Sequence, residues 1–162
     1  MKKIILAMVA VMVPLMLSAG STDFWFRHFS VEDGLSSSAV RAIMQDKYGF
    51  MWLGTDDGLN RYDGTTIKIY RLNPEGVNDY ISFLYDTTDR IWIGTGDGVY
   101  IYDYETENFE PFKLLTAKGD SIKTNVNHIA EDRDGNLWFS TVGQGIFKYN
   151  VSKHYLERYE FK

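Results

Sequence analysis

The sequence contains no cysteine, only 3 prolines and no excess of positive charge. Without cysteine, disulfide bonds, thiolate metal sites and thiol nucleophiles are excluded. The formal net charge of -5 provides no attraction to nucleic acid or to an anionic membrane surface, so neither partner is expected. Aromatic residues, in contrast, make up 15% of the 162 residues, and there are 14 glycines. This composition favours a β-rich domain with many tight turns.

A long apolar run occurs at the N-terminus. Two lysines precede an apolar stretch at residues 4–17, and small residues follow at 18–21. This order is typical of a secretory signal peptide, and the stretch is shorter than the ~20 residues that a membrane-spanning helix needs. We therefore expect residues 1–20 to be a signal peptide and the mature chain to be exported. If the segment is not cleaved, it anchors the chain to the membrane.

A tryptophan-centred pattern occurs three times in the remaining sequence. The tryptophans are Trp52, Trp92 and Trp138, about 40–50 residues apart, which is the period of β-propeller blades. Each follows an aspartate that is expected to open a tight turn, namely Asp46, Asp86 or Asp132. Each blade of a propeller is a four-stranded sheet.

The turn residues divide each repeat into four predicted strands. The first strands are expected at 40–45, 80–85 and 126–131, and the tryptophan-containing strands at 50–55, 90–95 and 136–141. The predicted fold is all-β, with three four-stranded antiparallel blades at roughly 40–72, 80–114 and 126–162. An orphan strand with Phe26 and Phe29 is expected to precede them. Because closure typically takes four to eight blades, residues 21–162 predict an incomplete propeller.

Residues that recur at equivalent positions are expected to be structural, since large rings at one strand position bury apolar area between neighbouring blades. They are Trp52, Trp92, Trp138, Gly54, Gly58, Gly94, Gly98, Tyr62, Tyr102 and Tyr149. The histidines occupy different repeat positions, and His128 is expected to align with Ala42 and Ser82. No catalytic triad, metal-ligand spacing or cofactor motif can be assembled, so we expect no catalytic residue, metal or cofactor.

A ligand surface is expected at one end of the blades. If the first strand of each blade is innermost, the connections between blades and the loops between second and third strands emerge on the same face. Their amide, hydroxyl, carboxylate and aromatic groups are those that a neutral or acidic sugar binds. The candidate ligand-binding residues are Arg41, Asp56, Asp57, Tyr80, Asp97, Asn125, Asn127 and Gln144. The alternative is that these loops are simply solvated.

Two segments carry a resemblance to a known family. The segments are Glu32-Asp-Gly-Leu-Ser36 and Trp52-Leu-Gly-Thr-x-x-Gly-Leu-x-Arg-Tyr-Asp-Gly64. They resemble the start of the sensor region of hybrid two-component systems in Bacteroidetes, which contains two-component regulator propeller repeats. The resemblance implies a periplasmic sensor of two propellers, followed by a β-sandwich, a membrane helix, a histidine kinase, a receiver and a DNA-binding domain. Members often respond to oligosaccharides, and ligand binding changes the sensor dimer.

Three functions therefore remain open for the chain. The first is a non-catalytic fragment of a sensor propeller that responds to an oligosaccharide, since this chain contains no kinase sequence. The second is a free-standing periplasmic module that completes its propeller by self-association through exposed blade edges. The third is an enzyme on a propeller scaffold, such as a lyase or hydrolase. The expected partners are an oligosaccharide, further propeller blades on the same or another polypeptide, and a second copy in a homodimer.

Overall fold

A computed structural model describes residues 26–72, 80–87 and 89–160, so the expected signal peptide lies outside the described residues. The described chain contains a short 3₁₀ helix, η2 (Val31–Asp33), and a series of short strands. The strands are β1 (Val40–Gln45), β2 (Met51–Thr55), β3 (Gly58–Tyr62), β4 (Ile67–Tyr70), β5 (Ile81–Asp86), β6 (Arg90–Thr95), β7 (Val99–Asp103), β8 (Asn108–Pro111), β9 (Val126–Glu131), β10 (Leu137–Thr141), β11 (Gly145–Asn150) and β12 (Tyr155–Tyr159).

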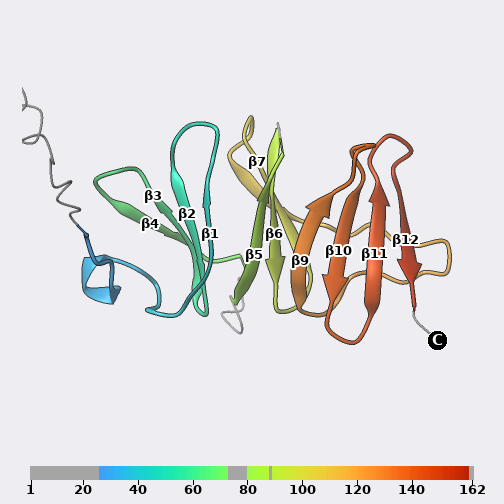
Figure 1. Cartoon of the computed structure of the whole chain (residues 1–162), viewed down its shortest axis with the longest axis horizontal. Coiled ribbons are helices and arrows are strands. Elements are labelled where there is room, and N and C mark those ends of the chain that lie inside the picture. Colours follow the sequence, from blue (N-terminus) through green and yellow to red (C-terminus); the bar gives the residue numbers. More distant parts are fainter. Residues whose placement is uncertain (1–25, 73–79, 88, 161–162) are drawn as a thin grey trace, which may run out of the picture.

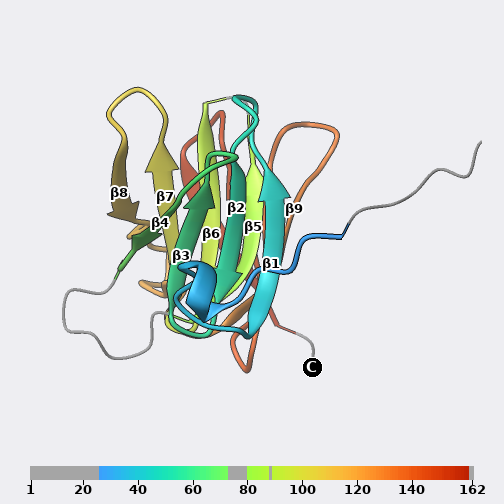
Figure 2. The same ribbon diagram turned by 90° about the vertical axis from the view of Figure 1, so that its left-hand side faces the viewer.

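The strands form three four-stranded sheets, β1–β4, β5–β8 and β9–β12, in which neighbours in sequence pair antiparallel (Figure 1). We call these sheets blades 1, 2 and 3. The first strand of blade 2, β5, contacts both β1 and β9, and Figure 2 shows these three strands on the side of the molecule opposite to β4 and β8. The first strand of each blade is therefore innermost. The all-β fold of three propeller-like blades, expected from the repeats, is confirmed.

The strand expected around Phe26 and Phe29 is not formed. Residues 26–30 have no strand conformation, and Phe26 is 95% exposed. A strand exists only when its backbone pairs with a neighbour, and residues 26–30 belong to none of the three described sheets. Phe29 instead packs edge-on against the ring of Tyr62, with 4.9 Å between centroids, and Arg27 donates a hydrogen bond to the Tyr62 hydroxyl.

An aspartate closes the turn between the first two strands of blade 1. Oδ1 of Asp46 accepts hydrogen bonds from the backbone N–H groups of Tyr48 and Phe50, both at 2.9 Å. Its Oδ2 accepts a third from the indole N–H of Trp52 at 2.7 Å. One carboxylate thereby fixes both the turn and the tryptophan rotamer. The same arrangement recurs in blade 3, where the indole of Trp138 donates to Asp132 at 2.9 Å.

Blade 2 lacks this arrangement, which corrects the expected alignment of Asp86 with the other two aspartates. Asp86 is still within β5 and pairs with Ile91, and the turn is closed by a bond from the N–H of Thr87 to the carbonyl of Arg90. The turn is one residue shorter than in blades 1 and 3. Thr87 therefore takes the place of the turn aspartate, and Asp86 instead accepts a hydrogen bond from the Tyr104 hydroxyl.

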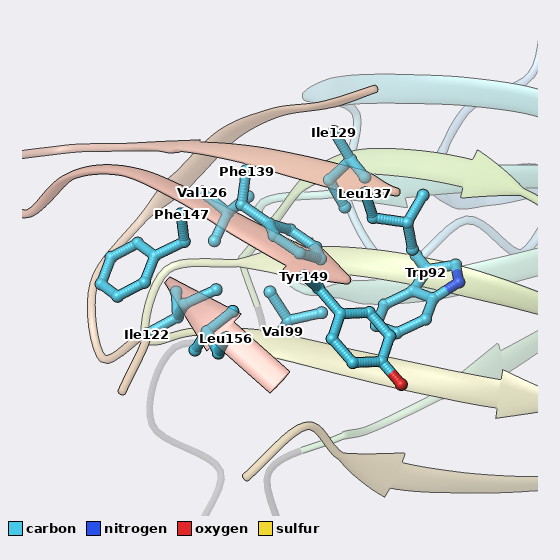
Figure 3. Close-up of a cluster of buried hydrophobic side chains, with 10 residues drawn as sticks. All are labelled: Trp92, Val99, Ile122, Val126, Ile129, Leu137, Phe139, Phe147, Tyr149 and Leu156. Atoms are coloured by element: carbon cyan, nitrogen blue, oxygen red, sulfur yellow. The ribbon is translucent and has the colours of Figure 1, made fainter. Parts of the chain in front are cut away.

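Each buried tryptophan packs against the next blade. The ring of Trp52 lies 5.1 Å from that of Tyr102, and the ring of Trp92 lies 5.8 Å from that of Tyr149. Figure 3 shows Trp92 and Tyr149 within the core between blades 2 and 3. Trp138 is half-buried and stacks on Tyr159 of its own blade at 5.6 Å. The core therefore lies between blades rather than within them.

Two glycines allow this close approach of blades. A Cβ at Gly54 would lie 2.6 Å from Cγ2 of Ile81, and one at Gly94 would lie 3.1 Å from the carbonyl oxygen of Val126. Both contacts are with the innermost strand of the following blade. Gly58 and Gly98 have a different role, because their φ values of 113° and 148° end the loop between the second and third strands.

Replacement of Trp92 by alanine tests the packing between blades. Trp92 is 3% exposed, so Trp92→Ala should reduce the free energy of unfolding by about 3–5 kcal/mol, measured by urea denaturation. Trp138→Ala is the matched control, because the half-buried ring loses fewer contacts and should cost clearly less. Equal costs for the two substitutions would contradict this account of the core.

The turn of blade 3 makes stability depend on pH. The hydrogen bond from the Trp138 indole, followed by those from Asn136 and the turn backbone, holds the pKa of Asp132 well below its usual value. Because the folded pKa lies below the unfolded one, this stabilisation is present above pH ~4 and is lost as the pH falls further. Wild type should therefore exceed Asp132→Asn in stability at pH 6 by more than at pH 3, in urea denaturation. A constant difference would contradict the assignment.

Candidate functional site

A β-bulge at the start of each innermost strand positions the candidate site. In blade 1, Val40 pairs with Thr55 and Ala42 with Gly54, so the residue between them has no partner. The same irregularity occurs in β5 and in β9. The unpaired residues are Arg41, Ser82 and Asn127. Bulges re-aim a side chain out of the sheet, so three equivalent positions present polar groups at one end of the innermost strands.

We call this end of the blades the loop face, since it carries the β2–β3, β6–β7 and β10–β11 loops and the connections between blades. The opposite end, with the β1–β2, β5–β6 and β9–β10 turns, is the turn face. Antiparallel pairing places the two sets of connections at opposite ends of the strands. The connections between blades and the loops between second and third strands therefore emerge on the same face, and the first strand of each blade is innermost, as expected.

Three of the candidate ligand residues lie together on the loop face. Arg41 donates two hydrogen bonds to Asp56, from Nε at 2.7 Å and from Nη2 at 3.0 Å. The guanidinium also lies 5.9 Å from the ring centroid of Tyr80, at the start of blade 2. The Arg41 hydrogen bond lowers the pKa of Asp56, so both groups are charged at neutral pH. The result is an exposed ion pair beside an aromatic ring, across two blades.

The other acidic candidates hold their own loops. Asp57 forms an ion pair with Arg71, whose hydrogen bonds lower the pKa of Asp57. Asp97 accepts a hydrogen bond from the Thr95 hydroxyl at 2.8 Å, within the β6–β7 loop. Neither carboxylate joins the group around Arg41. Both residues lie on the loop face, where their hydrogen bonds serve loop conformation.

The candidates of blade 3 differ among themselves. The Gln144 side chain accepts a hydrogen bond from the N–H of Lys123 at 3.0 Å and donates one to the carbonyl of Ser121 at 3.4 Å, which ties the long connection after blade 2 to the β10–β11 loop. Oδ1 of Asn125 is buried and has no hydrogen-bond partner among the described residues. Asn127 is exposed at the bulge. Of this set, Asn127 is the residue most open to a ligand.

Sequence reasoning missed the bulges and misplaced one histidine. His128 pairs with Ser140 just as Ala42 pairs with Gly54 and Phe83 with Gly94, so it aligns with Phe83 rather than Ser82. The reason is that β5 begins one residue later than expected. The His128 ring packs on that of Phe83, with 4.3 Å between centroids. The bulged Ser82 donates a hydrogen bond to the carbonyl of Val126, linking two innermost strands.

Two further properties concern the described residues as a whole. Across 26–72, 80–87 and 89–160, no group of three His, Asp or Glu side chains is arranged to hold a metal ion. Within the same ranges, no helix is both long and apolar enough to cross a membrane.

The family model for "two component regulator propeller" repeats matches residues 34–57 and 121–143. These segments contain the entry to blade 1 with its first turn, and the corresponding part of blade 3. The match therefore covers the innermost strands, the aspartate-closed turns and the tryptophan strands.

Relatives of known description agree with this match. A histidine kinase from Formosa agariphila is 56% identical over 59 residues, which is 36% of this chain and 4% of that protein. A structure described as the extracellular domain of a hybrid two-component system from B. thetaiotaomicron is 30% identical, with a TM-score of 0.72, over 82% of this chain and 20% of the other. The chain thus spans a small part of each relative.

A third match concerns the fold alone. A virginiamycin B lyase from Staphylococcus aureus is 20% identical, with a TM-score of 0.58, over 79% of this chain and 43% of that enzyme. Together, these matches show that residues 34–57 and 121–143 are similar to two-component regulator propeller repeats, and that the chain is similar to the extracellular domain of a hybrid two-component system.

Proposed function

We propose that the chain is part of the periplasmic ligand-sensing propeller of a hybrid two-component system, and that it binds an oligosaccharide on the loop face. One observation carries the proposal: Arg41, Tyr80 and Asp56 gather at a bulge that recurs in every described blade. Support comes from the extracellular domain that is 30% identical and shares this architecture. Export through residues 1–20, by a signal peptide that is cleaved or retained as an anchor, is part of the same proposal.

The groups around Arg41 suit a polyhydroxylated ligand. The Tyr80 ring provides a flat apolar surface for the C–H face of a sugar ring, as aromatic rings do in ligand pockets. Arg41 and Asp56 supply donors and acceptors side by side, and both groups are charged at neutral pH. Asn127 supplies an amide at the equivalent position in blade 3. A ligand longer than one sugar can therefore contact successive blades.

A specific observation also favours assembly with another blade. Trp138 occupies the position at which Trp52 and Trp92 are covered by the following blade, yet it is only half-buried. Lys148 lies 4.9 Å above its ring and Tyr159 stacks against it. A further blade on the same polypeptide, or a second copy of the chain, would cover this surface. The enzyme hypothesis gains no support from the lyase, which shares only the fold.

Alanine substitution on the loop face tests the sugar proposal. In a glycan array followed by titration calorimetry, Arg41→Ala and Tyr80→Ala should each weaken oligosaccharide binding at least about tenfold, because each removes a direct contact. Arg133→Ala, which removes an exposed arginine from a turn on the opposite face, should leave binding unchanged. The proposal fails if no oligosaccharide binds, or if both loop-face variants bind as wild type does.

A further inference from the structure

A cleft opens between blades 2 and 3 on the turn face, at the end of the strands opposite to Arg41. Its volume is about 450 Å³, within the range of small-molecule sites. Blade 2 contributes one wall and blade 3 the other. Its lining includes Arg90, Trp92, Glu131, Tyr149, Val151 and His154. We call this space the inter-blade cleft.

The junction between blades 1 and 2 shows what normally fills this position. There, Tyr104 inserts its ring beside that of Tyr48, with 5.3 Å between centroids, and its hydroxyl donates to Asp86 at 2.9 Å. Lys47 lies 4.4 Å above the same ring. The space left at that junction is about 270 Å³. One tyrosine thus plugs the gap and also satisfies the carboxylate at the end of the innermost strand.

Two differences in sequence open the junction between blades 2 and 3. Tyr149 and Tyr102 occupy equivalent positions in their blades, so Val151 is the residue of blade 3 that corresponds to Tyr104. The Val151 side chain is 48% exposed. The turn of blade 2 is also one residue shorter, as Thr87 closes it. Blade 3 therefore lacks the tyrosine that fills the other junction, and the turn of blade 2 lacks one residue.

The shorter turn also frees a hydrogen-bond donor. The indoles of Trp52 and Trp138 donate to their turn aspartates, but no described residue accepts from the indole N–H of Trp92. Figure 3 shows the Trp92 nitrogen and the Tyr149 oxygen at the same end of the core cluster. Both residues line the inter-blade cleft. The edges of two buried rings, one of them with an available N–H donor, therefore border the cleft.

Polar groups of both signs surround these ring edges. The Tyr149 hydroxyl lies 2.9 Å from Nδ1 of His154, which holds the imidazole over the cleft. Glu131 occupies the position in blade 3 that Asp86 occupies in blade 2. Its carboxylate accepts a hydrogen bond from the Tyr85 hydroxyl at 3.3 Å, whereas Asp86 accepts one from Tyr104. Arg90 pairs with Asp89 at the rim. The Arg90–Asp89 pair is neutral as a whole, so Glu131 is the remaining charge of the lining.

This chemistry selects one class of ligand. An anion would meet Glu131 and Asp89, and a cation would meet Arg90. A neutral ligand with several adjacent hydroxyls can instead donate to the carboxylates and accept from the guanidinium and the indole N–H. We propose that the inter-blade cleft is a binding site for a single neutral pyranose sugar, separate from the loop face.

The proposal does not depend on ligand binding at the loop face. The two regions lie at opposite ends of the strands, and the cleft shares no residue with the group around Arg41. Arg41→Ala should therefore leave binding in the cleft unchanged.

Saturation-transfer NMR on the chain with neutral methyl pyranosides tests the proposal. The panel comprises methyl glycosides of glucose, galactose, mannose and N-acetylglucosamine. At least one should receive saturation from the protein, with millimolar affinity as expected for a ligand of this size. Val151→Tyr, which restores the plug of the other junction, should weaken that binding at least about tenfold. Trp92→Phe keeps the ring but removes the N–H, and should weaken it several-fold.

Val142→Tyr is the matched control, because it introduces the same ring at a similarly exposed valine on the loop face. It should bind the pyranoside as wild type does. The proposal is overturned if no pyranoside binds, if Val151→Tyr binds normally, or if Val142→Tyr weakens binding as strongly as Val151→Tyr. Loss of pyranoside binding in Arg41→Ala would also overturn it, by assigning the sugar to the loop face and leaving the sensor proposal intact.

Discussion

The contact on which this structure depends is the packing of a tryptophan from one blade against a tyrosine of the next. A single four-stranded sheet of this size buries little apolar surface, and each blade gains its core only from its neighbour. Trp52 with Tyr102 and Trp92 with Tyr149 provide that core twice. Gly54 and Gly94 then admit the innermost strand of the following blade at close range. The same residue types recur in successive blades because each blade must fit the next.

This constraint leaves the two ends of the blades free to vary, and the candidate binding residues lie at these ends. On the loop face, a repeated bulge carries Arg41, Ser82 and Asn127, while the surrounding acidic residues are used to hold loops. On the turn face, a missing residue and a tyrosine replaced by Val151 convert a filled junction into the inter-blade cleft. Both regions arise from small departures from one template, without a change in the scaffold.

The sequence predicted the blades well because a repeated pattern reports backbone geometry directly. The strands around the three tryptophans lie close to their expected positions, and the innermost position of the first strand follows from the four-stranded blade. Register was harder to predict. The spacing from Asp86 to Trp92 equals that from Asp46 to Trp52, so the sequence alone aligned these aspartates. In the structure, the turn of blade 2 is shorter and Asp86 lies within β5, whereas Asp46 accepts a hydrogen bond from Trp52. The Arg41–Asp56 pair and the cleft depend on side chains brought together by folding, which no local spacing reveals.

A crystal structure of the protein with a bound oligosaccharide tests the central claim most directly, namely that the blades are a sensing surface. The account predicts sugar electron density against Tyr80 and Arg41 on the loop face, with a further blade or a second copy of the chain covering Trp138. The absence of an oligosaccharide from the loop face, or a Trp138 ring left open to solvent in the assembled protein, would contradict it.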